Sequence, residues 1–136
     1  LQFAFDSREE SDYLPHNYTH NCVVYTGTHD NDTVMGWYDT LKGADKKLCD
    51  DYLRLKNADG EPIPREQLPW EFVRAAMSSV ADLAIIPMQD YLGLGSEARI
   101  NIPSTLGINW KWRMGNGDFT KELAGRIRSM TKLYGR

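Results

Sequence analysis

The residues best suited to chemistry follow one another without a break near the first quarter of the chain. They are His29, Asp30, Asn31 and Asp32. They come directly after Val23–Thr28, a run of β-branched and aromatic residues that predicts a buried strand. A strand of this kind delivers the polar cluster to one edge of a sheet. We therefore expect the chemistry of the molecule at this strand tip.

Two kinds of chemistry suit the cluster. His29, Asp30 and Asp32 could ligate a metal ion for hydrolysis, although neighbouring positions on a strand tip point in different directions and their spacing matches no common metal motif. A carboxylate flanked by an imidazole and an amide also suits sugar chemistry, because a negative charge beside the anomeric centre stabilises an oxocarbenium-like transition state. The residue types alone leave these two interpretations close to even.

The elements that position the cluster read as strands separated by helices. We expect strands at Leu1–Phe5, Cys22–Thr28 and Leu83–Pro87, none of which shows hydrophobic alternation. Helical patterns follow Asp32 or Thr33, either of which suits an N-cap, and run through 44–57 and onward from Pro69. This order predicts an α/β fold with a parallel sheet and right-handed helical crossovers.

Two further segments carry aromatic and amide side chains. The loop 6–21 contains Tyr13 and His16, whose ring and imidazole suit contacts with a sugar-like ligand. Taken alone, the loop favours the alternative that Tyr13 and Leu14 only pack it onto the core. Trp110 and Trp112 are expected to serve packing rather than ligand stacking. A final amphipathic helix, capped by Asp118 and reaching Tyr134, is expected to serve packing alone.

Composition narrows the range of partners. The 136 residues carry a formal net charge of −3 with no basic stripe, which argues against nucleic acid and membrane surfaces. The 2 cysteines lie far apart and predict ordinary thiols in a reducing cytoplasm rather than a disulfide framework. The chain also opens on what reads as the inside of a strand, so we expect it to be a piece of a longer protein.

Five sequence motifs together resemble one known family. They are LQFAFD, PHN, TGTHDND, QDYLGLGSEARIN and NWKWR, and they stand in the order in which the C-terminal portion of the amylomaltases has them. Amylomaltases are 4-α-glucanotransferases of the clan that includes α-amylase. The resemblance covers essentially the whole chain and is weakest over residues 39–69.

The resemblance implies a fold and a reaction. The whole of 1–136 would be the C-terminal part, about strands six to eight, of a catalytic (β/α)₈ TIM barrel that is incomplete as given. The family transfers α-1,4-glucan segments between maltooligosaccharides, or from starch- and glycogen-derived glucans, by a retaining double displacement. No cofactor is implied. The family's nucleophile and acid/base lie upstream of Leu1, so we expect the isolated chain to be inactive.

The resemblance also assigns roles to residues. Asp30 matches the third catalytic carboxylate, which stabilises the transition state, and His29 matches the histidine that binds the same glucose. Further substrate contacts are expected at Asp6, Asn101, His16 and Asn17.

Two expectations follow for the chain alone. It could be a noncatalytic glucan-contacting or assembly segment rather than a working part of an enzyme. It would expose interior residues of the barrel such as Phe3, Val24, Tyr25 and Ile85 together with an open strand edge, so we expect it to self-associate or to pack against the missing portion.

Overall fold

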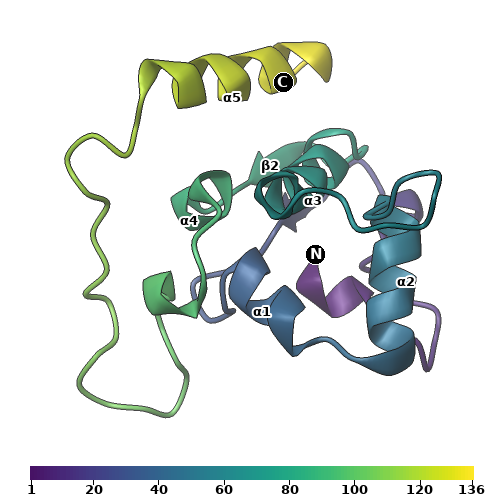
Figure 1. Cartoon of the computed structure of the whole chain (residues 1–136), viewed down its shortest axis with the longest axis horizontal. Helices are drawn as coiled ribbons and strands as arrows, with labels where there is room; N and C mark the ends of the chain where they lie inside the picture. The colour runs from purple at the N-terminus through teal and green to yellow at the C-terminus, as the bar shows by residue number, and fades with distance from the viewer.

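Two short parallel strands organise the computed structural model, which describes residues 1–136. Strand β1 (Val23–Tyr25) pairs with β2 (Leu83–Ile85), with Val24 opposite Ala84. The two strands are the predicted second and third ones, and both end earlier than predicted, at Tyr25 and Ile85. Parallel strands require a crossover connection, and here helices supply it (Figure 1).

The crossover from β1 to β2 consists of three helices. They are α1 (Val34–Thr40), α2 (Gly43–Leu53) and α3 (Leu68–Met77), and the last is preceded by a 3₁₀ turn at Arg65–Gln67. Their apolar faces enclose the main core, in which the Phe5 and Trp37 rings both contact the Phe72 ring edge-on, at centroid distances of 6.0 and 5.8 Å. The predicted α/β order of strand, helices and strand is confirmed for this part of the chain.

The first predicted strand is wrong. Residues Gln2–Ala4 form a 3₁₀-helix, and only the Leu1 amino group, which donates to the Tyr25 carbonyl oxygen at 2.6 Å, reaches β1. Successive carbonyl groups of a strand point to opposite edges, and the Cys22 carbonyl points toward β2, where it accepts from the Leu83 amide. The Tyr25 carbonyl, three residues later, therefore points away from β2, and Leu1 lies on that opposite edge of β1. Burial of the Phe5 ring among Trp37, Tyr52 and Phe72 draws the chain away from that edge and across the core.

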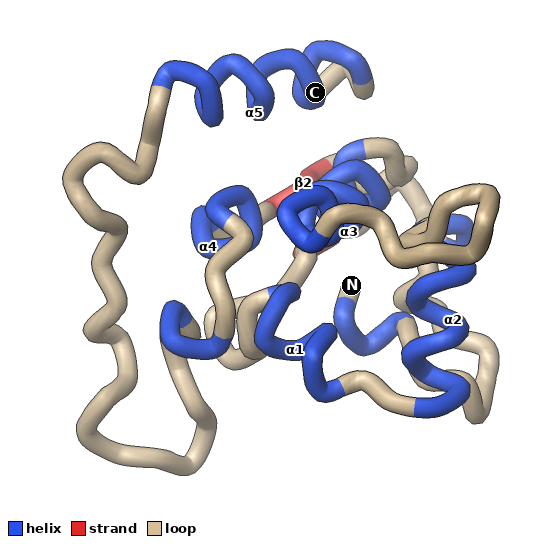
Figure 2. Tube along the Cα trace, in the orientation of Figure 1, coloured by secondary structure: helices blue, strands red, loops and turns tan.

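The chain after β2 reaches outward and then returns. Helix α4 (Met88–Leu92) and a 3₁₀ turn at Ser96–Ala98 lead into an extended segment, 99–120, before α5 (Lys121–Leu133) packs back against α3 (Figures 1 and 2). The predicted apolar face of the final helix is confirmed, since Leu123, Ile127 and Met130 contact the cluster around Trp70.

The predicted cap of this helix is wrong. Thr120 is the N-cap, and its side chain accepts a hydrogen bond from the Leu123 amide. The Asp118 carboxylate instead accepts from the Gly115 amide at 2.8 Å.

One face of the two-stranded sheet is covered and the other is open. Val24 is buried against Ala76 of α3 and Ala81, so its predicted exposure is wrong. Its neighbour Val23 is exposed in its place, because side chains alternate across a strand.

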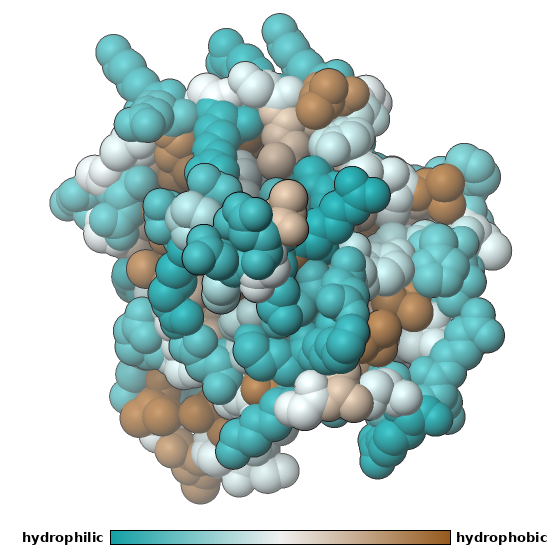
Figure 3. All heavy atoms as spheres, turned by 45° about the vertical axis from the view of Figure 1, so that its right-hand side comes forward, coloured by the Kyte–Doolittle hydropathy of each residue, from teal (hydrophilic) through white to brown (hydrophobic).

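The exposure predicted for Ile85 on the open face and for Phe3 beside it is confirmed at 39% and 66%, and Tyr25 is half-buried. Apolar groups reach the surface in the space-filling view (Figure 3). None of the helices combines the length and apolar character that crossing a membrane requires.

Candidate functional site

The loop from β1 to α1, residues 26–33, carries the predicted polar cluster just beyond the carboxyl end of β1. Two of its four polar residues maintain the loop itself. The Asn31 side-chain oxygen accepts hydrogen bonds from the Thr28 amide and hydroxyl, at 2.8 and 2.9 Å. The Asp32 carboxylate accepts from the Thr33 amide at 2.8 Å and from the Ser96 hydroxyl at 2.6 Å. His29 and Asp30 remain available for a ligand.

A second loop, which follows α4, meets this pair. The Asn101 side-chain amide donates to Asp30 Oδ1 at 2.6 Å, and His29 Nε2 lies 3.3 Å from the same oxygen. The predicted residues His29, Asp30 and Asn101 are therefore brought together from positions far apart in the chain. The side chains of His29 and Asp30 are 54% and 49% exposed, so a ligand can reach both. The hydrogen bonds and the ion pair of Asp30 involve its Oδ1 and its backbone oxygen rather than Oδ2.

Two residues at the site were not predicted to act there. The Arg99 guanidinium donates to the backbone oxygens of Asp30 and Asn101, at 2.6 and 2.9 Å, and so joins the two loops. The Trp110 ring lies beside the His29 ring with centroids 5.1 Å apart. Trp110 is 57% exposed, so it is not enclosed in a core, and its aromatic contact is with His29. Nothing in the sequence around Trp110, which directly follows the turn at Asn109, indicates a contact with His29.

The cavity at this point has the dimensions of a small-molecule site. Its volume is about 600 Å³, and it extends from the ends of both strands to the second loop. Its lining residues are Tyr25, Gly27, Thr28, His29, Asp30, Ile85, Pro87, Met88, Gln89 and Ile100. Apolar surface thus lies next to an exposed carboxylate and an imidazole, an arrangement that suits a neutral polar ligand with apolar C–H faces.

Three other predicted contact residues lie apart from this cavity. Asp6 pairs with Arg8, whose hydrogen bonds lower the pKa of the Asp6 carboxyl to about 2. His16 Nδ1 lies 3.0 Å from the Tyr52 hydroxyl, and the Asn17 side-chain amide donates to the Ser11 carbonyl oxygen at 3.1 Å. The structure does not bring these residues to Asp30, and their substrate contacts stay predictions.

The donor geometry does not favour the metal interpretation of the cluster. Asp32 is turned toward Ser96 and the start of α1, whereas Asp30 is turned toward Asn101. No group of three or more His, Cys, Asp or Glu side chains in the chain converges as a set of metal ligands.

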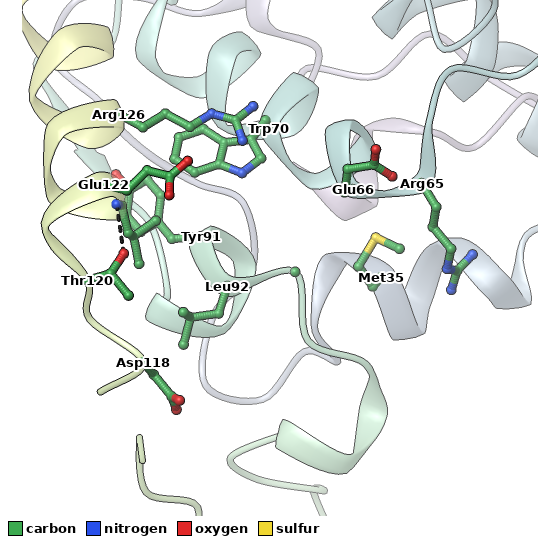
Figure 4. A pocket seen from close by; sticks show the side chains of 12 residues that line it. Met35, Arg65, Glu66, Trp70, Tyr91, Leu92, Asp118, Thr120, Glu122 and Arg126 are labelled. Carbon is green, nitrogen blue, oxygen red and sulfur yellow. Dashed lines mark hydrogen bonds between the residues drawn. The ribbon is translucent and has the colours of Figure 1, made fainter. Parts of the chain in front are cut away.

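A second cavity, of about 620 Å³, lies between α5 and the helices α3 and α4 (Figure 4). Its walls carry both signs of charge, and the Arg126 guanidinium covers the Trp70 ring at 3.7 Å from the centroid. Because Trp70 is buried beneath Arg126, its ring offers no free face to a ligand in this cavity.

Comparisons with known proteins agree with the resemblance. A family model described as 4-alpha-glucanotransferase, glycoside hydrolase family 77, matches residues 1–118. The chain is 48% identical to the 4-alpha-glucanotransferase of Clostridium butyricum and 46% identical to that of Thermus thermophilus, over 100% and 97% of its length. It spans about a quarter of those proteins, 27% and 26%.

A solved structure extends the agreement to the fold. The chain matches an amylomaltase from Streptococcus agalactiae, determined in complex with acarbose, at a TM-score of 0.85 and 35% identity, over 99% of this chain and 26% of that one. The parallel strands and their helical crossover are thus part of a TIM-barrel enzyme, as expected. Sequence and structure together place the chain in the 4-alpha-glucanotransferase family, glycoside hydrolase family 77.

Proposed function

We propose that the longer protein to which this chain corresponds transfers α-1,4-glucan segments between maltooligosaccharides, and that Asp30 is the carboxylate that stabilises the transition state. The observation that carries the proposal is the convergence of His29 and Asn101 on one oxygen of Asp30. These two contacts fix the carboxylate and leave Asp30 Oδ2 free for a sugar hydroxyl. The relatives named 4-alpha-glucanotransferase and the acarbose complex of a structural neighbour support the choice of substrate class.

In this proposal β1 and β2 are the seventh and eighth strands of the barrel. Their carboxyl ends both open into the Asp30 cavity, where barrels of this kind keep their sites. Leu1 lies on the edge of β1 away from β2, which is the edge where a sixth strand would pair. His29 would bind ring hydroxyls of the glucose at the cleavage point, and Asp30 would hold negative charge beside the anomeric carbon as positive charge develops there.

The chemistry of a retaining double displacement needs two further carboxylates, a nucleophile and an acid/base. The structure gives Asp30 an imidazole, an amide and a guanidinium as polar neighbours. The nucleophile and acid/base would therefore come from the remainder of the barrel. We propose that the 136-residue chain alone has no transferase activity. We also propose that the full protein works in the cytoplasm, and the two free thiols of this chain support that proposal.

The proposal is tested with Asp30→Asn in the full-length protein. This change removes the negative charge and keeps the size of the side chain, so turnover on maltotriose should fall by about 10²–10³-fold while the fold is retained. Asp32→Asn is the matched control, because Asp32 serves the loop rather than the cavity. Its effect on turnover should be much smaller. Near-normal turnover in the Asp30 variant would remove Asp30 from the mechanism.

A second candidate is a noncatalytic segment that contacts glucan or assembles with another chain. The open apolar face of the sheet favours it. Calorimetric titration of the isolated chain with maltoheptaose, followed by an assay for product, separates the two functions. If the isolated chain binds maltoheptaose and the full-length protein shows no transferase activity, the second candidate is favoured.

A further inference from the structure

Both ends of the loop that carries His29 and Asp30 are attached to one buried carboxylate. Asp90, on α4, is 1% exposed. The Thr26 hydroxyl, at the start of the loop, donates to Asp90 Oδ2 at 2.5 Å, and the Val34 amide, at its end, donates to Asp90 Oδ1 at 2.8 Å. Each carboxylate oxygen therefore holds one end of the loop.

We propose that Asp90 is a positioning residue that sets the place of Asp30 by holding the two ends of this loop at a fixed separation. The inference rests on the proposed function of Asp30. It assigns Asp90 no contact with the substrate, since its side chain lies behind the loop and out of solvent.

The energetics argue against a packing role for Asp90. A buried carboxylate is costly unless its oxygens are hydrogen-bonded, and an apolar side chain would fill the space at lower cost. No ion pair of the structure includes Asp90. Burial raises the pKa of its carboxyl, and the bonds from Thr26 and Val34 oppose that rise. What the carboxylate provides here is two acceptors at a fixed spacing, one for each end of the loop.

Helix α4 also holds the second loop of the site. Gln89, the neighbour of Asp90, is buried, and its side-chain amide donates to the Ala98 carbonyl oxygen at 3.1 Å. The next residue, Arg99, binds the backbone oxygen of Asp30. Consecutive residues of a single short helix therefore anchor the loop of Asp30 and the loop of Asn101, so that α4 sets their relative position.

The experiment compares Thr26→Val with Thr26→Ser in the full-length protein. Valine keeps the shape of threonine and loses the hydroxyl, whereas serine keeps the hydroxyl and loses a methyl group. Displacement of a catalytic group by about 1 Å can cost 10²-fold in rate, so Thr26→Val should lower kcat by roughly 10- to 100-fold and change KM little. Thr26→Ser should retain most of kcat. Hydrogen exchange of residues 27–34 should quicken only in the valine variant.

Two further variants complete the test. Asp90→Asn can keep both bonds, because its amide oxygen accepts from Val34 while its amide nitrogen donates to the Thr26 hydroxyl, and it should retain most of kcat; Asp90→Ala loses both bonds and should not. Normal kcat in folded Thr26→Val, with Asp30→Asn inactive, would overturn the positioning role and leave the proposed function standing. Normal kcat in Asp30→Asn would instead overturn the proposed function.

Discussion

Trp110 lies at the site in an unusual backbone conformation. Its φ is +64°, in the left-handed region that residues with a side chain rarely adopt, and its amide donates to the Ile100 carbonyl oxygen at 2.8 Å. The bond fixes the turn that brings the exposed indole against His29. An exposed indole face beside an imidazole and a carboxylate suits the apolar C–H face of a sugar ring.

Replacing this ring should therefore weaken substrate binding. We expect Trp110→Ala to raise KM for maltooligosaccharides by up to about tenfold, because an aromatic contact contributes roughly 0.5–1.5 kcal/mol, and to change kcat less. Trp110→Phe, which keeps an aromatic face, should lose less. Steady-state kinetics of the full-length protein provides the measurement. An unchanged KM in the alanine variant would show that the indole does not contact substrate.

The polar strand tip was the part of the site that the residues themselves could predict. His29 and Asp30 are adjacent in sequence and follow a strand, so their shared location needed no tertiary information. Asn101 lies 71 positions beyond Asp30, and Arg99 lies 69 positions beyond it. Such contacts depend on how α4 directs the second loop, which no local pattern encodes. Asn101 was predicted only through the family resemblance, and Arg99 was missed.

Among the elements, the start of α1 resolves an ambiguity that the sequence left open. Asp32 and Thr33 both suit an N-cap, and the structure selects Thr33, whose hydroxyl accepts from the Gly36 amide at 3.1 Å. Asp32 instead joins α1 to the turn after α4 through Ser96. The close approach depends on Gly36, where an added Cβ would lie 2.2 Å from the Ser96 hydroxyl oxygen.

The cap predicts a measurable contribution to stability. Thr33→Val removes the buried hydroxyl and keeps the shape, so it should lower the free energy of unfolding by about 1 kcal/mol. Thr33→Ser keeps the cap and should cost less. Urea unfolding of the full-length protein and its variants gives both values. If the serine variant is the less stable of the two, the methyl group rather than the cap stabilises this position.

The sequence-based element boundaries differ from the structure where tertiary contacts decide them. The apolar face of α5 follows from helical spacing alone, and it packs as predicted. The strand predicted at 1–5 has β-like residues, yet Phe5 gains more by entering the aromatic core than by pairing with β1. Asp118 is a residue type that often caps helices, but its carboxylate accepts from the Gly115 amide and closes a turn before the helix begins.

At the scale of the whole molecule, the sheet has a helical layer on one side only. Val24 and Ala84 pack beneath α3, whereas Val23 and Leu83 face away from it. Residues Val23, Leu83 and Ile85 therefore define an open apolar face on two adjacent strands. A groove of about 460 Å³ beside it, lined partly by Phe3 and Tyr13, continues the apolar surface. In the proposed barrel this surface would face the remaining strands.

The isolated 136-residue chain should consequently self-associate through the open face. Contiguous apolar surface and an unpaired strand edge both favour association in water, so sedimentation velocity should show oligomers at micromolar concentration. Leu83→Lys should shift the chain toward monomer, because it places a charge at the centre of the face. Leu133→Lys is the matched control, since Leu133 is also an exposed leucine, at 74% against 51% for Leu83, but lies on α5. A compact monomer that binds no hydrophobic dye would show that this face is stable in water without a covering partner.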